Sequence, residues 1–468
     1  MGEAPLMVGV SGLRGIVGRS LTSEVAVRYA QTVGAWLAEQ SPAPAVVVAR
    51  DGRAGGDAIY ADAIEGLLDA GVDVFEADVC MTPTVGVIVD ELNLAGGVMV
   101  TASHNPQQWN GLKVIRGSED GACAPDAEAA AAIVDRFNSG LSASGSKGKP
   151  KRLDFDPSAR HTERVVGHLG RLGRSFRVVV DSVNASGRIA SPMLMSALGC
   201  ELVRHLGSDD SGIFPHTPEP TRDNLSGKGG LCDVVAEIGA DVGFAQDPDA
   251  DRLAIVDENG AYIGEELTLA LCAVSVLEAV KPEAGTPMLC TNLSTSRMID
   301  DVAARYGAKV VRSAVGEANV VEAMKRLKRE GKTVVLGGEG NGGVIWPEVT
   351  YVRDSLSAMA LVLSLMARTG KRLSDLVADV PAYAIVKRKQ PLARKEDAVP
   401  ALERVASAYA DQRVDRQDGV RVDFDADRSW VHVRASNTEP ILRLIAEAPT
   451  AERAESLLDE VHRLVDAG

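Results

Sequence analysis

A serine, a histidine and a lysine lie close together in the chain just after an apolar run. Residues 97–100 (GVMV) have the pattern of a buried strand, and residues 101–106 (TASHNP) follow them directly. A hydroxyl at the C-terminal end of such a strand can act as a nucleophile or a phosphate carrier, because open α/β sheets bind ligands at this edge. A strand-end serine can also simply cap the turn that follows. We interpret Ser103 as a candidate carrier, with His104 and Lys113 as its neighbours.

Three aspartates alternate along a second segment that follows an apolar run. Asp247, Asp249 and Asp251 come after residues 242–245 (VGFA), and Arg252 completes the segment. Alternate carboxylates in an extended loop can direct several oxygens toward one hard divalent cation, and the adjacent guanidinium can pair with a phosphate that shares the site. An isolated acidic turn is usually only solvated. Three aspartates at a period of two, directly after a strand pattern, favour a metal site.

Two other segments invite comparison with nucleotide-binding motifs. Residues 338–343 (GEGNGG) fit Gly-x-Gly-x-x-Gly, but residues 344–347 (VIWP) are a poor start for the helix that this fingerprint requires. Residues 331–333 (GKT) end like a phosphate-binding P-loop, but the earlier glycine of that motif falls on Arg326. The sequence therefore does not favour a dinucleotide-binding protein or a nucleotide-dependent kinase.

The segments that must position these loops alternate between strand and helix patterns. The expected strands are residues 45–49, 72–75, 97–101, 176–180, 201–205, 242–246, 288–290, 309–312 and 333–336. The expected helices are residues 25–37, with Thr22 or Ser23 as N-cap, 57–70, 84–92, 189–198, 231–238, a segment after 294, 316–328 and 355–367. This alternation predicts three similar α/β units with parallel sheets, in which each functional loop leaves the C-terminal end of a strand.

The C-terminal part follows a different pattern. Residues 383–387, 420–424, 430–434 and 441–445 alternate as half-buried strands, with helical patterns at 399–410 and 451–465. The predicted fold class is therefore α/β, with three units of mainly parallel mixed sheets and a C-terminal α+β domain. The expected domains are residues 1–150, 151–257, 258–370 and 371–468, and residues 139–150 have the composition of a linker.

Composition limits the classes of function. A chain of 468 residues exceeds what one hydrophobic core usually supports, which agrees with several domains. Its 65 acidic and 50 basic residues give a net charge of −15, which argues against nucleic acid and anionic membranes as partners. The six cysteines are scattered and fit core positions better than a disulfide framework. With no leader-like or long apolar segment, we expect a cytoplasmic protein.

Four segments, taken in chain order, resemble motifs of the α-D-phosphohexomutase family. They are TASHNP at 101–106, DPDADR at 247–252, GEGNGG at 338–343 and RASNTEP at 434–440. The resemblance covers nearly the whole chain and implies four domains around a central cleft. It also implies an isomerase that interconverts hexose 6-phosphate and hexose 1-phosphate through a phosphoserine enzyme and a hexose 1,6-bisphosphate intermediate. The substrates would be small hexose phosphates, held by a local basic pocket in an acidic protein, and the enzyme would be a monomer or a homodimer.

The resemblance implies a role for each matched residue. Ser103 would carry the phosphate, His104 and Lys113 would lie near the reacting oxygen as acid or base, and Arg14 would face the cleft as a further catalytic residue. Mg²⁺ would be held by Asp247, Asp249 and Asp251 with an oxygen of the Ser103 phosphate. The implied substrate-binding residues are Arg252, Glu339, Asn341, Arg434, Ser436, Asn437 and Thr438. A carboxylate such as Glu339 can accept bonds from two sugar hydroxyls, and the loop at 434–438 suits a phosphate dianion. Arg50, Asp51 and Arg53 resemble a structural charge network.

Three departures from the family pattern leave the sugar open. Asn341 replaces a serine of the sugar loop, Gly343 stands where several relatives carry histidine, and residues 313–317 (SAVGE) lack a lysine found in relatives. The glycine-rich variant is most similar to branches assigned to phosphoglucosamine mutase or phosphomannomutase, so glucosamine phosphate is the first choice and mannose and glucose phosphates follow. A Mg²⁺-dependent sugar phosphatase with a phosphoserine intermediate and a non-catalytic sugar-phosphate sensor are the alternatives.

Overall fold

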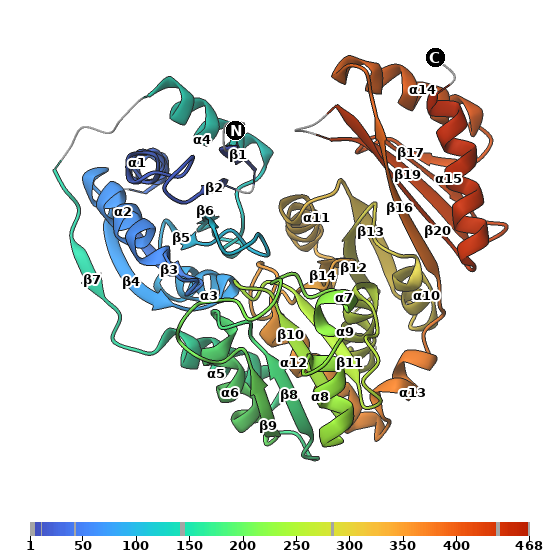
Figure 1. Ribbon diagram of the computed structural model, residues 1–468, viewed down its shortest axis with the longest axis horizontal. Coiled ribbons are helices and arrows are strands. Elements are labelled where there is room, and N and C mark those ends of the chain that lie inside the picture. Colours follow the sequence, from blue (N-terminus) through green and yellow to red (C-terminus); the bar gives the residue numbers. More distant parts are fainter. Residues whose placement is uncertain are drawn as a thin grey trace.

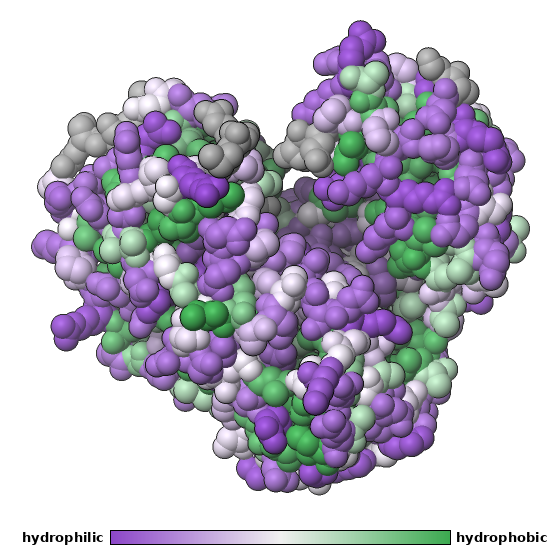
Figure 2. All heavy atoms as spheres, in the orientation of Figure 1, coloured by the Kyte–Doolittle hydropathy of each residue, from purple (hydrophilic) through white to green (hydrophobic). Residues whose placement is uncertain are grey.

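The computed structural model describes residues 5–10, 12–41, 44–140, 146–281, 285–436 and 440–466. Its helices and strands form four units, numbered I to IV in chain order, each built on one β-sheet. Units I and IV form two arms that are joined through units II and III (Figure 1), and the surface is hollowed between the arms (Figure 2). No helix within these described ranges is long and apolar enough to span a membrane.

Unit I is built on a mixed sheet whose described strands are, in spatial order, β1 (Met7–Gly9), β2 (Gly12–Ile16), β6 (Trp109–Arg116), β5 (Gly96–Val100), β3 (Ala45–Arg50), β4 (Asp73–Val79) and β7 (Pro150–Arg152). Its helices are α1 (Ser23–Ala38), α2 (Gly56–Asp69), α3 (Thr82–Leu92) and α4 (Ala127–Ser139). Alternate residues of β3 face two separate cores. Val46 and Val48 pack with α1, α2 and α4, whereas Val47 and Ala49 pack with α3. Helices therefore cover both faces of the sheet.

Units II and III are smaller sheets of the same kind. The strands of unit II, in spatial order, are β11 (Leu253–Asp257), β10 (Val242–Gln246), β8 (Arg177–Asp181) and β9 (Glu201–Leu206), with helices α5 (Pro157–Leu169), α6 (Gly187–Leu198), α7 (Arg222–Leu225) and α8 (Leu231–Ile238). Those of unit III are β13 (Lys309–Ser313), β12 (Pro287–Asn292), β14 (Thr333–Glu339) and β15 (Gly343–Ile345), with helices α9 (Glu265–Ala279), α10 (Met298–Arg305), α11 (Glu317–Arg329) and α12 (Ser355–Thr369).

Units I, II and III share one strand arrangement. In each, a parallel strand is followed in the chain by an antiparallel strand that pairs with it: β5 by β6, β10 by β11, and β14 by β15. The loop between the two strands therefore leaves the C-terminal end of a parallel strand, where open α/β sheets bind ligands. These three loops carry the serine, aspartate and sugar-loop motifs. The expected similarity of the three α/β units is confirmed.

Helices α9 and α12 fill the space between units II and III. They pack against each other, and α12 also contacts α5 and α6 of unit II. Both helices are buried on nearly all sides, with Leu269, Cys272 and Met359 at most 2 % exposed. One apolar core therefore runs through units II and III, which holds the aspartate loop and the sugar loop in a fixed relation.

Unit IV is an antiparallel sheet with helices on one face, as expected for an α+β domain. Its described strands are, in spatial order, β16 (Ala384–Pro391), β20 (Ile441–Ala448), β19 (Ser429–Ala435), β18 (Val420–Phe424) and β17 (Arg413–Asp415). Helix α13 (Leu373–Ala378) leads into the unit, which also contains the 3₁₀ helix η2 (Lys395–Asp397), α14 (Ala398–Ala408) and α15 (Ala451–Asp466). Val431 and Val433 of β19 face α14 and α15. Arg434 lies on the opposite face because side chains alternate along a strand.

The expected linker differs in part from the structure. Residues 141–145 lie outside the described residues, but Lys149 donates its backbone N–H to Asp73 Oδ1 at 2.7 Å. Pro150 begins β7, which pairs with β4. The sheet of unit I therefore continues to residue 152. Sequence patterns do not indicate this edge strand, because its residues are exposed and held by pairing with β4, without an apolar pattern. The domain boundaries at 257 and 370 stay predictions.

Candidate active site

Ser103 lies in the loop after β5 with its hydroxyl directed toward the aspartate loop. Its side chain is nearly buried, and its backbone is left-handed, with φ of 50°. Ser103 Oγ lies 3.0 Å from Asp247 Oδ2 and 3.3 Å from His104 Nδ1. A non-glycine residue rarely adopts such a backbone unless its surroundings hold it there. The loop therefore presents this one hydroxyl to a carboxylate of another unit.

A buried network holds the serine loop in this shape. Asp51 Oδ2 accepts hydrogen bonds from Arg53 Nε at 2.8 Å and from Thr101 Oγ1 at 2.6 Å, and Thr101 Oγ1 accepts the Ser103 N–H at 2.9 Å. Arg53 also donates to the Ser103 carbonyl at 2.5 Å. Arg50 takes no part in these bonds and pairs with Asp57 and Asp78 at the surface. Of the three residues expected to form a charge network, Asp51 and Arg53 position the serine.

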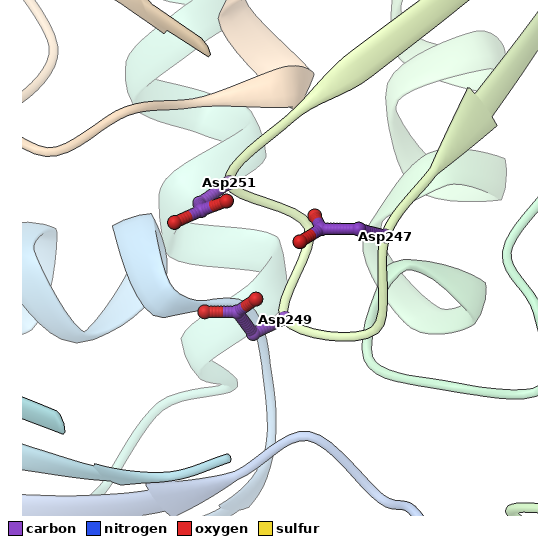
Figure 3. A group of neighbouring side chains, drawn as sticks. All are labelled: Asp247, Asp249 and Asp251. Carbon is purple, nitrogen blue, oxygen red and sulfur yellow. The ribbon is translucent and has the colours of Figure 1, made fainter. Parts of the chain in front are cut away.

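The three aspartates of the β10–β11 loop point toward one another (Figure 3). Asp247, Asp249 and Asp251 are fully buried, and each offers a carboxylate oxygen within 4.8 Å of the others. Ala250, between the second and third, has φ of 56°, and this tight turn brings their side chains to one side. Like charges at this separation repel each other strongly in a buried setting. The cluster therefore requires cations to stabilise it.

Two oxygens of the cluster fit a bound cation. Asp249 Oδ1 and Asp251 Oδ1 are buried and accept no hydrogen bond from the part of the chain that the structure describes, although the other oxygen of each carboxylate is bonded. Burial, followed by the charges of Asp251 and Asp249, raises the pKa of Asp247 well above its usual value. Carboxylate oxygens are the ligands that hard dications prefer. Asp247, Asp249 and Asp251 can therefore hold a metal ion.

Lys113 and His104 flank the serine in different protonation states. Lys113, in β6, donates from Nζ to Asp249 Oδ2 at 2.6 Å and to Asp251 Oδ2 at 2.9 Å. Burial lowers the pKa of Lys113, but the charges of Asp249 and Asp251 outweigh it and raise the pKa above its ordinary value. Burial, followed by the charges of Arg252 and Arg14, lowers the pKa of His104 to about 4. At neutral pH, Lys113 therefore carries its proton, and the imidazole is uncharged and able to accept one.

Arg14 and Arg252 bring positive charge to the same region. Arg14, in β2, donates from NH1 to Asn105 Oδ1 at 3.1 Å, and burial lowers its pKa from the ordinary value. Arg252 donates its backbone N–H to Asp247 Oδ1 at 3.1 Å, and its side chain lines the cleft. Guanidinium groups are well suited to phosphate oxygens.

Glu339, the last residue of β14, has both carboxylate oxygens anchored. Asn292 Nδ2 donates to Oε1 and Arg353 NH1 donates to Oε2, each at 2.8 Å. Asn341 follows in the loop and accepts the Gly343 N–H on Oδ1 at 3.2 Å. These contacts fix the orientation of the carboxylate at the wall of the cleft, where it can accept hydrogen bonds from hydroxyl groups.

A pair of arginines lies on the opposite wall, in unit IV. Arg434 of β19 and Arg443 of β20 stand directly opposite each other in the antiparallel register, and both line the cleft. Arg434 Nε lies 3.1 Å from Asp418 Oδ2. Like charges directly opposite in a sheet are destabilising unless an anion lies between them. Ser436 is nearly buried just beyond β19, whereas Asn437 and Thr438 lie outside the described residues.

One cleft of about 680 Å³ brings these groups together. Of the residues expected at the site, it is lined by Arg14, Ser103, His104, Lys113, Arg252, Glu339, Asn341 and Arg434. The sequence interpretation missed Glu317, Arg353, Asp418 and Arg443, which also line it. Among the described lining residues, six lysine and arginine side chains face three carboxylates, so the cleft is more basic than the protein as a whole.

Comparison with known proteins identifies the family. Residues 5–143, 166–260, 265–383 and 385–464 match, in order, domains I, II, III and the C-terminal domain described as phosphoglucomutase/phosphomannomutase. The chain belongs to the phosphoglucomutase/phosphomannomutase family. A relative from Thermococcus kodakarensis, named "Phosphoglucomutase/phosphomannomutase", is 34% identical over 97% of both chains. A relative from Methanopyrus kandleri, named "Probable phosphoglucosamine mutase", is 36% identical over 97% of this chain and 96% of its own.

A solved member of the phosphoglucomutase/phosphomannomutase family has the same architecture. The crystal structure from Burkholderia thailandensis superposes with a TM-score of 0.82 at 27% identity and covers 98% of both chains. Family membership confirms the predicted four-domain α/β fold and makes this chain a phosphohexomutase, an isomerase that acts by phosphotransfer. The roles of individual residues stay predictions, which the geometry now makes testable.

Proposed function

We propose that this phosphohexomutase interconverts hexosamine 6-phosphate and hexosamine 1-phosphate through a phosphorylated Ser103. The observation that carries the proposal is that one cleft has a candidate phosphoryl carrier at one wall and an arginine pair at the other. Ser103 and the aspartates lie on units I and II, and Arg434 and Arg443 on unit IV. A hexose phosphate can place its hydroxyl at the serine while its phosphate contacts the arginines.

The residues around Ser103 supply what phosphoryl transfer needs, which is alignment and charge stabilisation. The buried Asp51–Arg53 network holds the serine loop, so that Oγ stays directed at the aspartates. The neutral imidazole of His104 can accept the proton of the attacking hydroxyl. Mg²⁺ held by Asp247, Asp249 and Asp251 would stabilise charge on the transferred phosphoryl group. Arg14 and Arg252 add positive charge at the same place.

The reaction requires the sugar to bind in two opposed orientations. After the first transfer, the hexose 1,6-bisphosphate must turn so that its other phosphate faces Ser103. The contacts at the far wall must then accept either phosphate, and Glu339 must accept hydroxyls of either orientation. The anchoring of Glu339 by Asn292 and Arg353 leaves its position unchanged between the two half-reactions. The same bisphosphate, added in small amounts, would rephosphorylate Ser103 and activate the enzyme.

The arginine pair offers a direct test of this shared phosphate site. In a Ser103→Ala background, which prevents turnover, Arg434→Ala should weaken the binding of glucosamine 6-phosphate and of glucosamine 1-phosphate, each by about a hundredfold, because a charge-assisted and potentially bidentate contact is lost. Calorimetric titration of each phosphate measures both affinities. Arg428→Ala is the matched control, because Arg428 lies at the surface of the same unit and pairs with Asp301. Weakening of only one of the two phosphates would contradict the shared site.

The sugar loop should determine which hexose phosphate is preferred. The Methanopyrus kandleri relative's name and the glycine-rich form of the loop at residues 338–343 support glucosamine phosphate as the first choice. Glu339→Gln removes a charge that faces the cleft and should lower kcat/KM about tenfold on every accepted hexose phosphate. Asn341→Ser should instead change the ratio of kcat/KM among glucosamine, mannose and glucose phosphates. Kinetics of both variants on the three sugars test this, and unchanged ratios in Asn341→Ser would contradict a role for Asn341 in specificity.

A further inference from the structure

Arg353 contacts carboxylates of both the aspartate loop and unit III. Its NH2 donates to Asp251 Oδ2 at 2.6 Å and its NH1 donates to Glu339 Oε2 at 2.8 Å, while Nε lies 3.2 Å from Glu317 Oε2. The residue is 9 % exposed. Although burial lowers the pKa of Arg353, the charges of Asp251, Glu317 and Glu339 raise it well above the ordinary value. A single planar cation thus joins the candidate metal loop to the sugar loop.

Arg353 bonds to one carboxylate oxygen of Asp251 and to one of Glu339, and so fixes the direction in which each carboxylate points. Asp251 Oδ2 accepts hydrogen bonds from Arg353 and Lys113, so Oδ1, which accepts none from the described residues and lies 3.9 Å from Arg252 Nε, is the oxygen offered to a cation. Glu339 has Oε2 bonded to Arg353 and Oε1 bonded to Asn292. Rotation of either carboxylate would break its bond to Arg353. Movement at one loop is therefore transmitted to the other through a rigid guanidinium plane.

The backbone that presents Arg353 is itself fixed. The Arg353 N–H donates to Glu317 Oε1 at 3.0 Å, and the Asp354 N–H donates to the Val344 carbonyl at 2.7 Å. Asp354 is fully buried, caps α12 through the Leu356 N–H, and contacts His161 Nε2 at 3.0 Å. The guanidinium is thus held from a point where units II and III share their core.

Gly343 makes room for the Arg353 side chain. A Cβ added at Gly343 would lie 2.3 Å from Arg353 Cδ and 3.2 Å from Arg353 Cγ. These are the inner methylenes of the side chain, and they cannot move away without displacing the guanidinium. Any side chain at position 343 therefore competes with Arg353 for the same space.

We propose that Arg353 is a positioning residue that aligns the metal-binding Asp251 with the sugar-binding Glu339, and that Gly343 is its steric counterpart. This inference rests on the proposed function of the two loops. It assigns Arg353 a role that a diffuse positive charge cannot fill, because one planar group donates directed hydrogen bonds to Asp251 and Glu339 while its Nε stays in ion-pair contact with Glu317. An ammonium at the same place would act as a point charge and could not keep all three contacts.

Arg353→Lys is the informative variant, because it keeps the charge and removes the fork. It should weaken Mn²⁺ binding at the aspartate loop by about tenfold or more, and it should lower kcat and raise KM for glucosamine phosphate. Mn²⁺ titration followed by electron paramagnetic resonance reads the metal site without any need for turnover. If the wild type shows no mutase activity, the proposed function is wrong. The Mn²⁺ titration would still test the link from Arg353 to Asp251, because it does not depend on turnover.

Arg421→Lys is the matched control for a buried arginine. Arg421 is 1 % exposed and pairs with Asp423 in unit IV. This change should lower the melting temperature but leave the Mn²⁺ affinity within about twofold of the wild type, since the two sites share no contact. If Arg353→Lys also binds Mn²⁺ and turns over within about twofold of the wild type, Arg353 acts only as a charge and the proposal is wrong.

A double-mutant cycle tests the pairing of Gly343 with Arg353. Gly343→Ala alone should lower kcat/KM. In an Arg353→Ala background the same change should lower kcat/KM by at most about threefold relative to Arg353→Ala alone, because the clash with Cδ is gone. Gly340→Ala is the control within the same loop, since its Cβ would meet the Glu266 carboxylate at 2.1 Å and not Arg353. Its effect should multiply with that of Arg353→Ala to within about twofold. If the double variant loses kcat/KM by the product of the Gly343→Ala and Arg353→Ala losses, the two residues act independently and the steric pairing is wrong.

Discussion

Ser103→Ala is expected to lower mutase turnover by more than about a thousandfold while the protein stays folded. The substitution removes the one hydroxyl that faces Asp247 at 3.0 Å, and with it the group that would carry the phosphate between the two half-reactions. The loop itself is held by Asp51, Arg53 and the backbone of residue 103, so its shape should persist. Steady-state kinetics with added hexose 1,6-bisphosphate measure the loss.

Two observations accompany this expectation. Intact-mass spectrometry of the active wild type should show one added phosphate that is absent from Ser103→Ala. The melting temperature of the variant should remain close to that of the wild type, and its Mn²⁺ affinity should match that of the unphosphorylated wild type, because the three aspartates are unchanged and only the serine-phosphate ligand is absent. Turnover at the wild-type rate in Ser103→Ala would mean that another group carries the phosphate.

Removal of the metal should have the second large effect. Excess chelator should abolish turnover and Mg²⁺ should restore it, because the buried Asp249 Oδ1 and Asp251 Oδ1 accept no hydrogen bond from the described residues and are free to bind a cation. Asp249→Asn should weaken Mg²⁺ binding by about a hundredfold, since a neutral amide oxygen is a poorer ligand for a hard dication and the amide nitrogen is no ligand at all. Isothermal titration with Mg²⁺ and kinetics at increasing Mg²⁺ measure both changes.

Asp257→Asn provides the matched control for a buried aspartate of unit II. Asp257 Oδ1 accepts the backbone N–H groups of Asn259 and Ala261 in a turn away from the cluster. This variant should lose stability and retain its Mg²⁺ dependence. Full activity of the wild type in excess chelator would show that the aspartate cluster serves a different purpose.

The parts of the fold that sequence could predict are those with a strong local pattern. Apolar runs such as residues 45–49 and 242–246 are buried on both faces of a sheet and therefore leave a continuous apolar signal. Helix α9 was not expected, because its apolar residues are spread around the helix and form no amphipathic stripe for periodicity to detect. The short strands β1 and β7 were also missed, since pairing and not composition makes them strands.

The predictable parts of the site are those in which neighbouring residues form one cluster. The aspartates at 247, 249 and 251 are such a case, and so is the serine loop. Arg443 becomes part of the site only through the register of β19 and β20, which places it opposite Arg434. Arg353 reaches Asp251 from a position 102 residues away in the chain. Contacts of this kind depend on tertiary packing, and local sequence patterns do not contain them.

The central claim is that the cleft moves a phosphoryl group between two positions of one sugar. The most direct test is ³¹P nuclear magnetic resonance of glucosamine 1-phosphate incubated with the enzyme, Mg²⁺ and a trace of glucosamine 1,6-bisphosphate. The account predicts that the 1-phosphate signal converts to a 6-phosphate signal until equilibrium, with total organic phosphate constant. Growth of an inorganic phosphate signal at the expense of both sugar phosphates would contradict it and indicate a phosphatase.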